Sequence, residues 1–449
     1  MIGRATTAAR SGEGAAGLVD SLLLIGARIG ANLLALVWTM LLVRMIQPEL
    51  SGIAFRAIAM AQIGSILLTM NVESGSVRAL VPAMQAGRLD EAAGFLRFNR
   101  RIILTSLPIL AALTALWHLS GIGGASPALT LAIAAAMVMC AVARMTARHA
   151  TALGVMRKGL LPRLLTGPLV LSAGLGLALL LGLQLMPWHV AALFGLSEAL
   201  TVLVQRRLLR VAFAPFAGRR PAATAWRDWL SLGLWLSPGL LMTEYRKAVL
   251  IASAGLLLPS AQLSLFAVAL SIMNIVNFGV VAVDVAFSPR IARAMAADDP
   301  ARRDRMLAVS GAIKLAGLLL AAVLLALLGR WALDLFGAEY RAAWPALLVL
   351  MAIPAGSILF GPASVLLSSR GMGRADFTGN VLGAALLVGV VAAGSALSGL
   401  TGAAAGAAAG HLLSQAIMAG LCRRRLGIDS SLATLRHLAP APRLSRAAT

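Results

Sequence analysis

The chain has 449 residues, 59% hydrophobic and 12% charged, and its mean hydropathy of +0.87 is far above that of a soluble domain with a polar surface. The formal net charge of +22 does not indicate a nucleic-acid-binding protein, because the arginines lie in short clusters between apolar segments. Cys140 and Cys422 provide neither a disulfide framework nor a metal-ligand spacing.

Apolar segments long enough to cross a bilayer recur along almost the whole chain. A hydrocarbon core of about 30 Å takes about 20 helical residues. The sequence therefore predicts an all-α polytopic membrane protein of about twelve transmembrane helices. The predicted spans are residues 18–46, 51–75, 102–119, 127–147, 162–184, 188–208, 229–257, 261–287, 307–332, 343–369, 377–397 and 399–422.

Basic residues mark every second connection between the spans. Arg97 follows the second span, Arg157 follows the fourth and Arg206 lies at the end of the sixth, whereas the intervening connections carry few basic residues. The positive-inside rule then places both termini in the cytoplasm, with the chain as a multi-pass protein of a bacterial inner membrane. Trp226 falls at the inner boundary of this arrangement, as an interfacial aromatic residue would.

An internal repeat appears when the chain is shifted against itself by 211 residues, which aligns Pro48 with Pro259 and Glu73 with Asp284. Each half has six spans, so the halves are predicted to share one orientation and to be related by a pseudo-two-fold axis along the membrane normal. The predicted domains are a cytoplasmic tail 1–17, a six-helix bundle 18–210, a basic linker 211–228, a second six-helix bundle 229–422 and a cytoplasmic tail 423–449.

Small residues and prolines predict local geometry in the last spans. The Gly402, Gly406 and Gly410 series allows close helix approach, either in packing within the chain or in dimerisation. Three prolines predict a kinked tenth span.

Residues 47–55 (QPELSGIAF) contain a Pro-Glu-x-x-Gly turn between the first two predicted helices. Residues 335–340 (LFGAEY) contain a Phe-Gly-x-x-Tyr element before the tenth, and residues 371–374 (GMGR) are followed by Asn380. Together with the Gly- and Ala-rich last span, these segments resemble the oligosaccharide-lipid flippases, within the superfamily that also contains the multidrug and toxic-compound extrusion pumps. The resemblance extends over essentially the whole chain.

The resemblance implies two bundles that alternate between inward-open and outward-open states, and a polyprenyl-pyrophosphate-linked oligosaccharide as substrate. Relatives that flip the peptidoglycan precursor usually carry two further helices, so twelve predicted spans favour a capsule, O-antigen or exopolysaccharide unit. We expect a monomer in contact with membrane lipids, with a polysaccharide polymerase or a glycosyltransferase as a candidate partner. A flippase breaks no bond, so we expect no enzyme activity and no cofactor.

Charged residues inside the spans are the candidate functional residues, because each costs about 2.5–3.5 kcal/mol at a helix centre on insertion scales. Arg28 lies ten residues into the first span, and Asn32 follows one turn later on the same face. Arg28 is predicted to donate paired hydrogen bonds to a pyrophosphate or an acidic sugar. The alternative is a structural ion pair with an acidic residue of a neighbouring helix.

Further candidate cations lie in the second and seventh spans. Arg246 and Lys247 are candidate substrate-binding residues, and Glu244 beside them is a candidate coupling or gate residue. Glu244 and Lys247 are three residues apart and could instead neutralise each other. Arg56 is a third substrate-binding candidate, although an arginine so close to the outer boundary can also extend to the head groups.

Two carboxylates, Glu73 and Asp284, occupy repeat-equivalent positions near the cytoplasmic ends of their spans, and Asn277 shares a helix face with Asp284. A carboxylate in a low-dielectric cavity could take up and release a proton during transport. Alternatively, the two carboxylates pair with Arg78 and Arg290 and close the cytoplasmic gate, or they cap helix ends. The sequence leaves these alternatives open.

The excess of cations over acids within the spans favours an anionic substrate and therefore a flippase. The alternative is a multidrug or organic-cation antiporter of the same fold, whose cavity should have net negative character. A membrane enzyme of glycan assembly would usually present a large catalytic outer loop, whereas the longest outer connection, around Arg330 to Trp344, is short. A non-transporting scaffold would not need buried charges.

Overall fold

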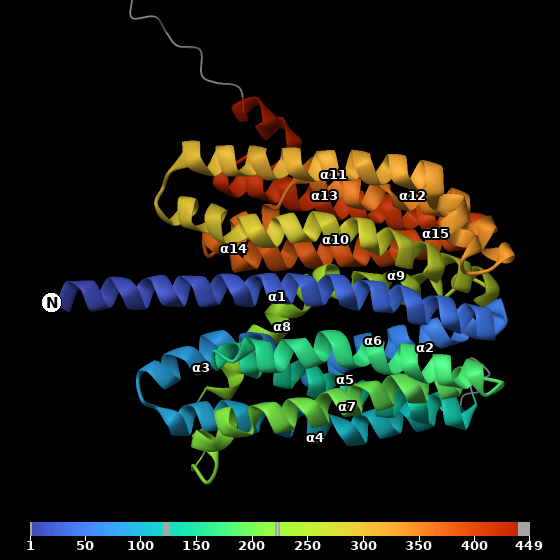
Figure 1. The fold of residues 1–449 in the computed structure, drawn as a ribbon, viewed down its shortest axis with the longest axis horizontal. Coiled ribbons are helices and arrows are strands. Elements are labelled where there is room, and N and C mark those ends of the chain that lie inside the picture. The colour runs from blue at the N-terminus through green and yellow to red at the C-terminus, as the bar shows by residue number, and fades with distance from the viewer. Residues whose placement is uncertain (1, 120–125, 221, 223–224, 439–449) are drawn as a thin grey trace, which may run out of the picture. The chain divides into compact units, whose positions relative to one another are not determined.

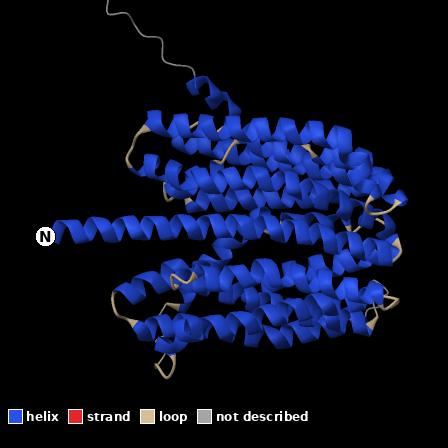
Figure 2. Cartoon of the chain, viewed as in Figure 1, coloured by secondary structure: helices blue, strands red, loops and turns tan. Residues whose placement is uncertain are grey.

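The computed structural model describes residues 2–119, 126–220, 222 and 225–438. Helices form all the regular structure of this part of the chain, and no strand occurs in it (Figure 2). The chain divides into two compact units, Met1–Ser237 and Pro238–Thr449. The predicted all-α membrane fold is therefore confirmed, and Figure 1 labels its helices.

The first unit is built around α5, α6 and α7, which pack on one another, with α1 against α6 and α2 against α5. Prolines occupy the first position of α2, α5 and α7, where a missing backbone N–H costs no helix hydrogen bond. Its helices are α1 (Ile2–Met45), α2 (Pro48–Thr69), η1 (Val72–Gly75), α3 (Ser76–Gln85), α4 (Leu89–Leu119), α5 (Pro127–Ala152), α6 (Met156–Leu180), α7 (Pro187–Phe213), η2 (Ala214–Phe216) and most of α8 (Trp226–Thr243).

In the second unit α10 packs on α11, and α9, α12, α13 and α14 pack on α15. Asp299 caps α11 by accepting a hydrogen bond from the Arg302 backbone N–H at 2.9 Å. Its helices are α9 (Arg246–Ala254), α10 (Ser260–Ala296), α11 (Pro300–Asp334), η3 (Ala338–Ala343), α12 (Trp344–Leu350), α13 (Ala352–Phe360), α14 (Ala363–Ser369), α15 (Gly373–Leu426) and η4 (Leu432–Leu438).

Ten helical segments of the described chain are long and apolar enough to cross a membrane. The seventh predicted span is not among them because it is broken between α8 and α9 at Glu244 and Tyr245. The eleventh and twelfth predicted spans count as one segment because α15 contains both. Ser398 and Gly399 have non-helical backbone and join the two legs of α15. The described helices thus follow the twelve-span prediction.

The glycine series of the last span packs within the chain. A Cβ at Gly402 would lie 2.0 Å from the Gly394 carbonyl oxygen, and one at Gly406 would lie 2.4 Å from the Val390 carbonyl oxygen. Both contacts are with the other leg of α15. The small residues therefore allow the backbones of a helical hairpin to touch.

The tenth span is broken rather than continuous, as its prolines predict. η3, α12, α13 and α14 share it, with interruptions at Met351 and at Gly361 and Pro362. Pro362 cannot donate the hydrogen bond that would continue the helix.

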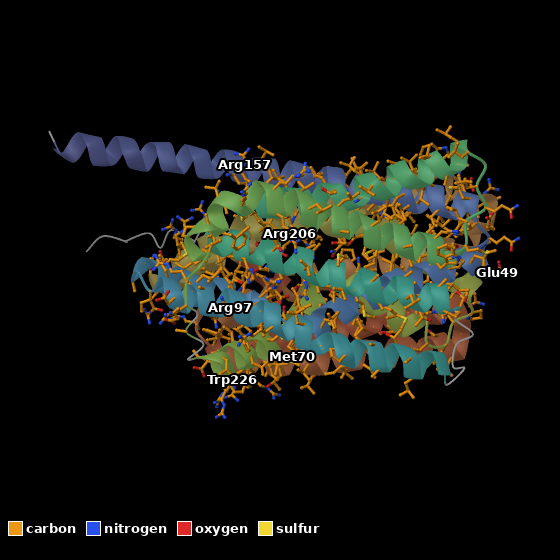
Figure 3. The ribbon with its side chains drawn as sticks, turned by 90° about the horizontal axis from the view of Figure 1, so that it is seen from below. Glu49, Met70, Arg97, Arg157, Arg206 and Trp226 are labelled. Atoms are coloured by element: carbon orange, nitrogen blue, oxygen red, sulfur yellow. The ribbon has the colours of Figure 1, made fainter. Side chains whose placement is uncertain are left out.

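The basic connections of the first unit gather at one end of its helices. Figure 3 shows Arg97, Arg157, Arg206 and Trp226 toward this end and Glu49 at the opposite end. The basic residues that alternate along the sequence are thus also gathered in space.

The segment that follows α15 packs on the second unit. Leu426 ends the helix, and Ile428 then enters a buried cluster with Ile291 and Leu307. Ser430 Oγ donates to the Phe360 carbonyl oxygen at 2.7 Å, and η4 packs on α11. We call residues 427–438 the C-terminal strap; residues 439–449 lie outside the described part.

The two units divide inside α8, between Ser237 and Pro238. The physical reason is that the first half of α8 packs on the first unit. Trp229 is 7% exposed in a cluster with Phe95 and Leu80.

Candidate functional site

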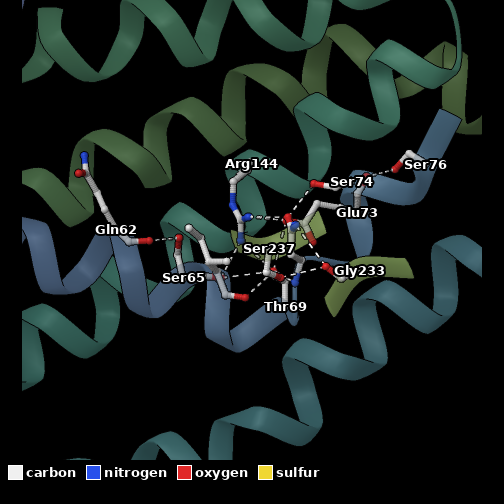
Figure 4. Close-up of polar contacts among 11 residues, drawn as sticks. Gln62, Ser65, Thr69, Glu73, Ser74, Ser76, Arg144, Gly233 and Ser237 are labelled. Atoms are coloured by element: carbon white, nitrogen blue, oxygen red, sulfur yellow. Dashed lines mark hydrogen bonds and ion pairs between the residues drawn. The ribbon is translucent and has the colours of Figure 1, made fainter. Parts of the chain in front are cut away.

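A fully buried ion pair joins the end of α2 to α5. Glu73 lies in η1, and its Oε1 is 2.6 Å from Nη1 of Arg144. Both side chains are 0% exposed. Figure 4 shows the two groups pointing toward each other within a wider set of polar contacts. Each charge of such a buried pair compensates the other, because either charge alone in the interior would be strongly destabilising.

Polar groups of α2 complete the surroundings of the Arg144 guanidinium. Nη2 donates to the Ser65 carbonyl oxygen and to Thr69 Oγ1, each at 2.8 Å. Nη1 donates to Asn71 Oδ1 at 3.4 Å, and Thr69 Oγ1 donates to Glu73 Oε1 at 3.3 Å. The guanidinium is therefore held by side-chain and backbone acceptors as well as by the carboxylate.

The predicted partner of Glu73 is not the one found. Arg78 is exposed on α3, and Arg144 neutralises the carboxylate instead. Arg144 lies inside the predicted span 127–147, but it is not among the candidate residues named from the sequence. Its position within a span is the signal that identifies it as an intramembrane charge.

The second unit contains a related pair, Asp284 of α10 with Lys314 of α11. Lys314 Nζ is 2.8 Å from Asp284 Oδ1, and their side chains are 1% and 31% exposed respectively. Arg290, the predicted partner, is exposed and lies over the Phe287 ring instead. Asn277, two turns before Asp284, is 7% exposed. Sequence reasoning missed Lys314 although it lies inside the predicted span 307–332.

Arg28 lies on one face of α1, and residues of this face are buried toward the C-terminal end of the helix. Arg28, Asn32 and Thr39 share this face, and Thr39 is 0% exposed. The adjacent face, with Ile29 and Leu33, presents exposed apolar side chains suited to lipid. Arg28 is itself exposed, and Asn32 Nδ2 donates to its carbonyl oxygen at 3.0 Å. Arg28 thus shares a helix face with a residue that is buried three turns later, but its own side chain is exposed.

Arg56 is half-buried on α2 between the buried residues Phe55 and Ala57. It lies eight residues after Pro48, the first residue of the helix, or about 12 Å along the axis. This depth is within the span rather than at its end.

Arg246 and Lys247 are the first two residues of α9, directly after the break in the seventh span. Lys247 Nζ donates to Ser271 Oγ of α10 at 2.8 Å. Neither cation forms an ion pair with a carboxylate in the described part of the chain. Glu244 is exposed on the turn before them, so Lys247 contacts Ser271 rather than Glu244.

The start of α9 adds positive potential to these two cations. Tyr245 is its N-cap, and no side chain caps the helix. The first backbone N–H groups of a helix are not used within it, and they carry the positive end of the helix dipole. The break therefore creates a place where an anion would meet two cations and a helix N-terminus together.

His411 of α15 is a further buried polar residue near this place, which sequence reasoning missed. It is 1% exposed, its Nε2 is 3.0 Å from Ser357 Oγ, and Arg246 lies within electrostatic range of it. A histidine within a predicted span is the signal that could identify it. Among the described residues, no three His, Cys, Asp or Glu side chains gather as metal ligands.

No protein-family model matches this chain, and no curated protein matches it in sequence. Its fold resembles solved transporters. An inward-facing multidrug resistance MATE family transporter of the MOP superfamily has a TM-score of 0.70 and 16% identity, over 93% of this chain and 100% of that chain. An outward-facing transporter of the same family has a TM-score of 0.61 and 16% identity, over 90% and 93%.

A third structure is a MOP superfamily transporter from Pyrococcus furiosus, described as having a binding pocket of reverse polarity that suggests a different function. Its TM-score is 0.56 at 15% identity, over 91% of this chain and 98% of that chain. At these identities the similarity establishes a shared fold along nearly the whole chain.

Proposed function

We propose that this protein is an alternating-access transporter that flips a polyprenyl-pyrophosphate-linked oligosaccharide from the cytoplasmic to the periplasmic leaflet, for polysaccharide synthesis. Two lines of support are the shared fold with solved transporters and the resemblance of its sequence segments to oligosaccharide-lipid flippases. The substrate class follows from the charges inside the helices.

The observation that carries the proposal is the cationic start of α9. Arg246 and Lys247 lie at the break of a discontinuous membrane helix, and neither is paired with a carboxylate of the described chain. In transporters, such half-helix N-termini point at anionic groups of the substrate. A pyrophosphate would accept hydrogen bonds from both side chains and from the backbone N–H groups of α9.

The acidic residues support the same substrate class. Glu73 and Asp284 are each engaged by a basic side chain, at 2.6 Å and 2.8 Å. A carboxylate already neutralised in this way offers little to an organic cation. The multidrug transporters that share the fold make an organic-cation antiporter the second candidate function.

Flipping of a fluorescent polyprenyl-pyrophosphate oligosaccharide in proteoliposomes tests the proposal. Arg246→Ala and Lys247→Ala should each lower the flipping rate roughly 10- to 100-fold, since a hydrogen bond to a charged group contributes about 1.5–3 kcal/mol. Arg28→Ala should also lower it. Arg424→Ala, which removes an exposed arginine of the same unit, is the matched control and should leave the rate unchanged.

One outcome would identify the second candidate function. A wild-type protein that moves no lipid-linked oligosaccharide but accumulates a cationic dye against a proton or sodium gradient is an antiporter. In that case the Arg246 and Lys247 variants should retain dye transport.

A further inference from the structure

The first half of α8 packs on other helices of the first unit. Trp229 packs edge-to-face on Phe95 of α4, with ring centroids 5.2 Å apart and ring planes at 88°. Leu232 lies over Gly75 of η1, where a Cβ at Gly75 would be 2.9 Å from Leu232 Cδ2. Two side chains one turn of α8 apart are thus in contact with α4 and η1.

Gly233 of α8 lies very close to the backbone of the turn that follows α2. A Cβ at this position would lie 2.7 Å from the Met70 carbonyl oxygen and 2.7 Å from Val72 Cα. Only glycine fits at such distances without displacing α8. Asn71 Nδ2 donates to the Gly233 carbonyl oxygen at 3.4 Å.

The turn after α2, which Gly233 contacts, contains two residues with positive φ. Met70 and Asn71 are both left-handed, with φ of 48° and 54°. Such positions persist where the surroundings hold them. Asn71 Oδ1 accepts hydrogen bonds from Arg144 Nη1 at 3.4 Å and from Ser74 Oγ at 2.6 Å. The Glu73–Arg144 pair thus holds the side chain that contacts α8.

The chain leaves the first unit at the next turn of α8. Ser237 Oγ still donates to the Gly233 carbonyl oxygen at 2.9 Å, and the division between the units falls directly after it. Pro238 has no N–H to continue the helix ladder and favours a kink. Gly239 already lies beside Asn380 of α15 in the second unit, with a Cβ position 3.6 Å from Asn380 Nδ2.

We propose that residues 226–237 of α8 stay fastened to the first unit throughout transport, and that the helix accommodates movement of the units at Pro238. Asn71, held by Glu73 and Arg144, is the positioning residue of this fastening. The inference rests on the proposed function only in requiring that the two units move during transport. It is independent of the substrate.

A disulfide between α8 and η1 tests the fastening. Gly75→Cys with Leu232→Cys should form a disulfide on mild oxidation, because a Cβ at Gly75 would lie 2.9 Å from Cδ2 and 3.5 Å from Cγ of Leu232. If residues 226–237 stay on the first unit, the oxidised protein should retain at least about half of the wild-type transport rate. Loss of transport on oxidation, restored by a reductant, would overturn the proposal. The two single variants and the wild type, whose own cysteines are buried, are the oxidation controls.

The transport readout uses whichever probe the wild type moves, the lipid-linked oligosaccharide or the cationic dye. A failure of the flippase proposal therefore leaves this test intact.

Hydrogen–deuterium exchange gives a second readout that needs no substrate. Asn71→Ala should speed exchange of residues 226–237 roughly five- to tenfold, as expected for the loss of one buried hydrogen bond. Residues 246–254, in the second unit, should be unchanged. Thr146→Ala, which removes a hydroxyl bonded only to its own helix in α5, is the matched control. Unchanged exchange of residues 226–237 in Asn71→Ala would contradict the role of Asn71.

Discussion

Removal of Arg144 should leave Glu73 as an uncompensated charge inside the first unit. The two side chains are 0% exposed and 2.6 Å apart, so Arg144→Met removes the only cation that pairs with this carboxylate in the described chain. Breaking a buried pair costs about 3–5 kcal/mol. The double variant Glu73→Gln/Arg144→Met removes both charges. Its loss in free energy of unfolding should therefore be smaller than the sum of the two single losses by at least about 2 kcal/mol.

Hydrogen–deuterium exchange of peptides covering η1 and the middle of α5 measures these effects separately from the second unit. In Arg144→Met these amides should exchange roughly 200- to 5,000-fold faster, which corresponds to about 3–5 kcal/mol. The exposed pair Arg88 and Glu91 is the matched control. Its single variants should change local stability by less than about 1 kcal/mol. Single effects of Glu73 and Arg144 that add to within about 0.5 kcal/mol would refute the coupling.

Three further predictions concern the second unit. Gly406→Leu should separate the legs of α15 and lower the yield of folded protein in gel filtration, whereas Gly389→Leu, with no atom within 4 Å of its Cβ position, should not. Lys314→Met should speed exchange in α10 by less than Arg144→Met does in η1, because the Asp284 side chain is 31% exposed and can be hydrated. Hydrogen bonds from the Ser431 side chain and backbone lower the pKa of Asp429. This lowered pKa stabilises the C-terminal strap at neutral pH, and the stabilisation is lost as the pH falls below about 4. Hydrogen–deuterium exchange of the strap should therefore accelerate below that pH. In Asp429→Asn the exchange should no longer show this dependence on pH.

Much of the fold could be predicted from the sequence because hydropathy and charge act along the chain. Apolar length locates the spans, and the clustering of basic residues at one end of the helices follows from the same pattern. The glycines of the last span and the prolines of the tenth also act locally. These features need no knowledge of which helices are neighbours.

The partners of the acidic residues could not be predicted in the same way. Arg78 follows Glu73 closely in sequence, whereas Arg144 reaches it only because α5 packs on α2. The division of the units inside α8 has the same origin, since it depends on Gly233 meeting the turn after α2. Sequence reasoning does recognise charges within spans, and applied fully it would have identified Arg144, Lys314 and His411 as exceptional.

The acidic residue occupies the same position in both halves of the internal repeat, but its basic partner comes from a different span in each half. Glu73 takes its cation from α5, the fourth span of its half, whereas Asp284 takes its cation from α11, the third span of the other half. The two environments differ as well. Glu73 is sealed at 0% exposure, while the Asp284 side chain is 31% exposed beside a buried lysine. A carboxylate must be reached by water to exchange a proton, so we infer that Asp284 is the better candidate for coupling and that Glu73 serves the structure of the first unit.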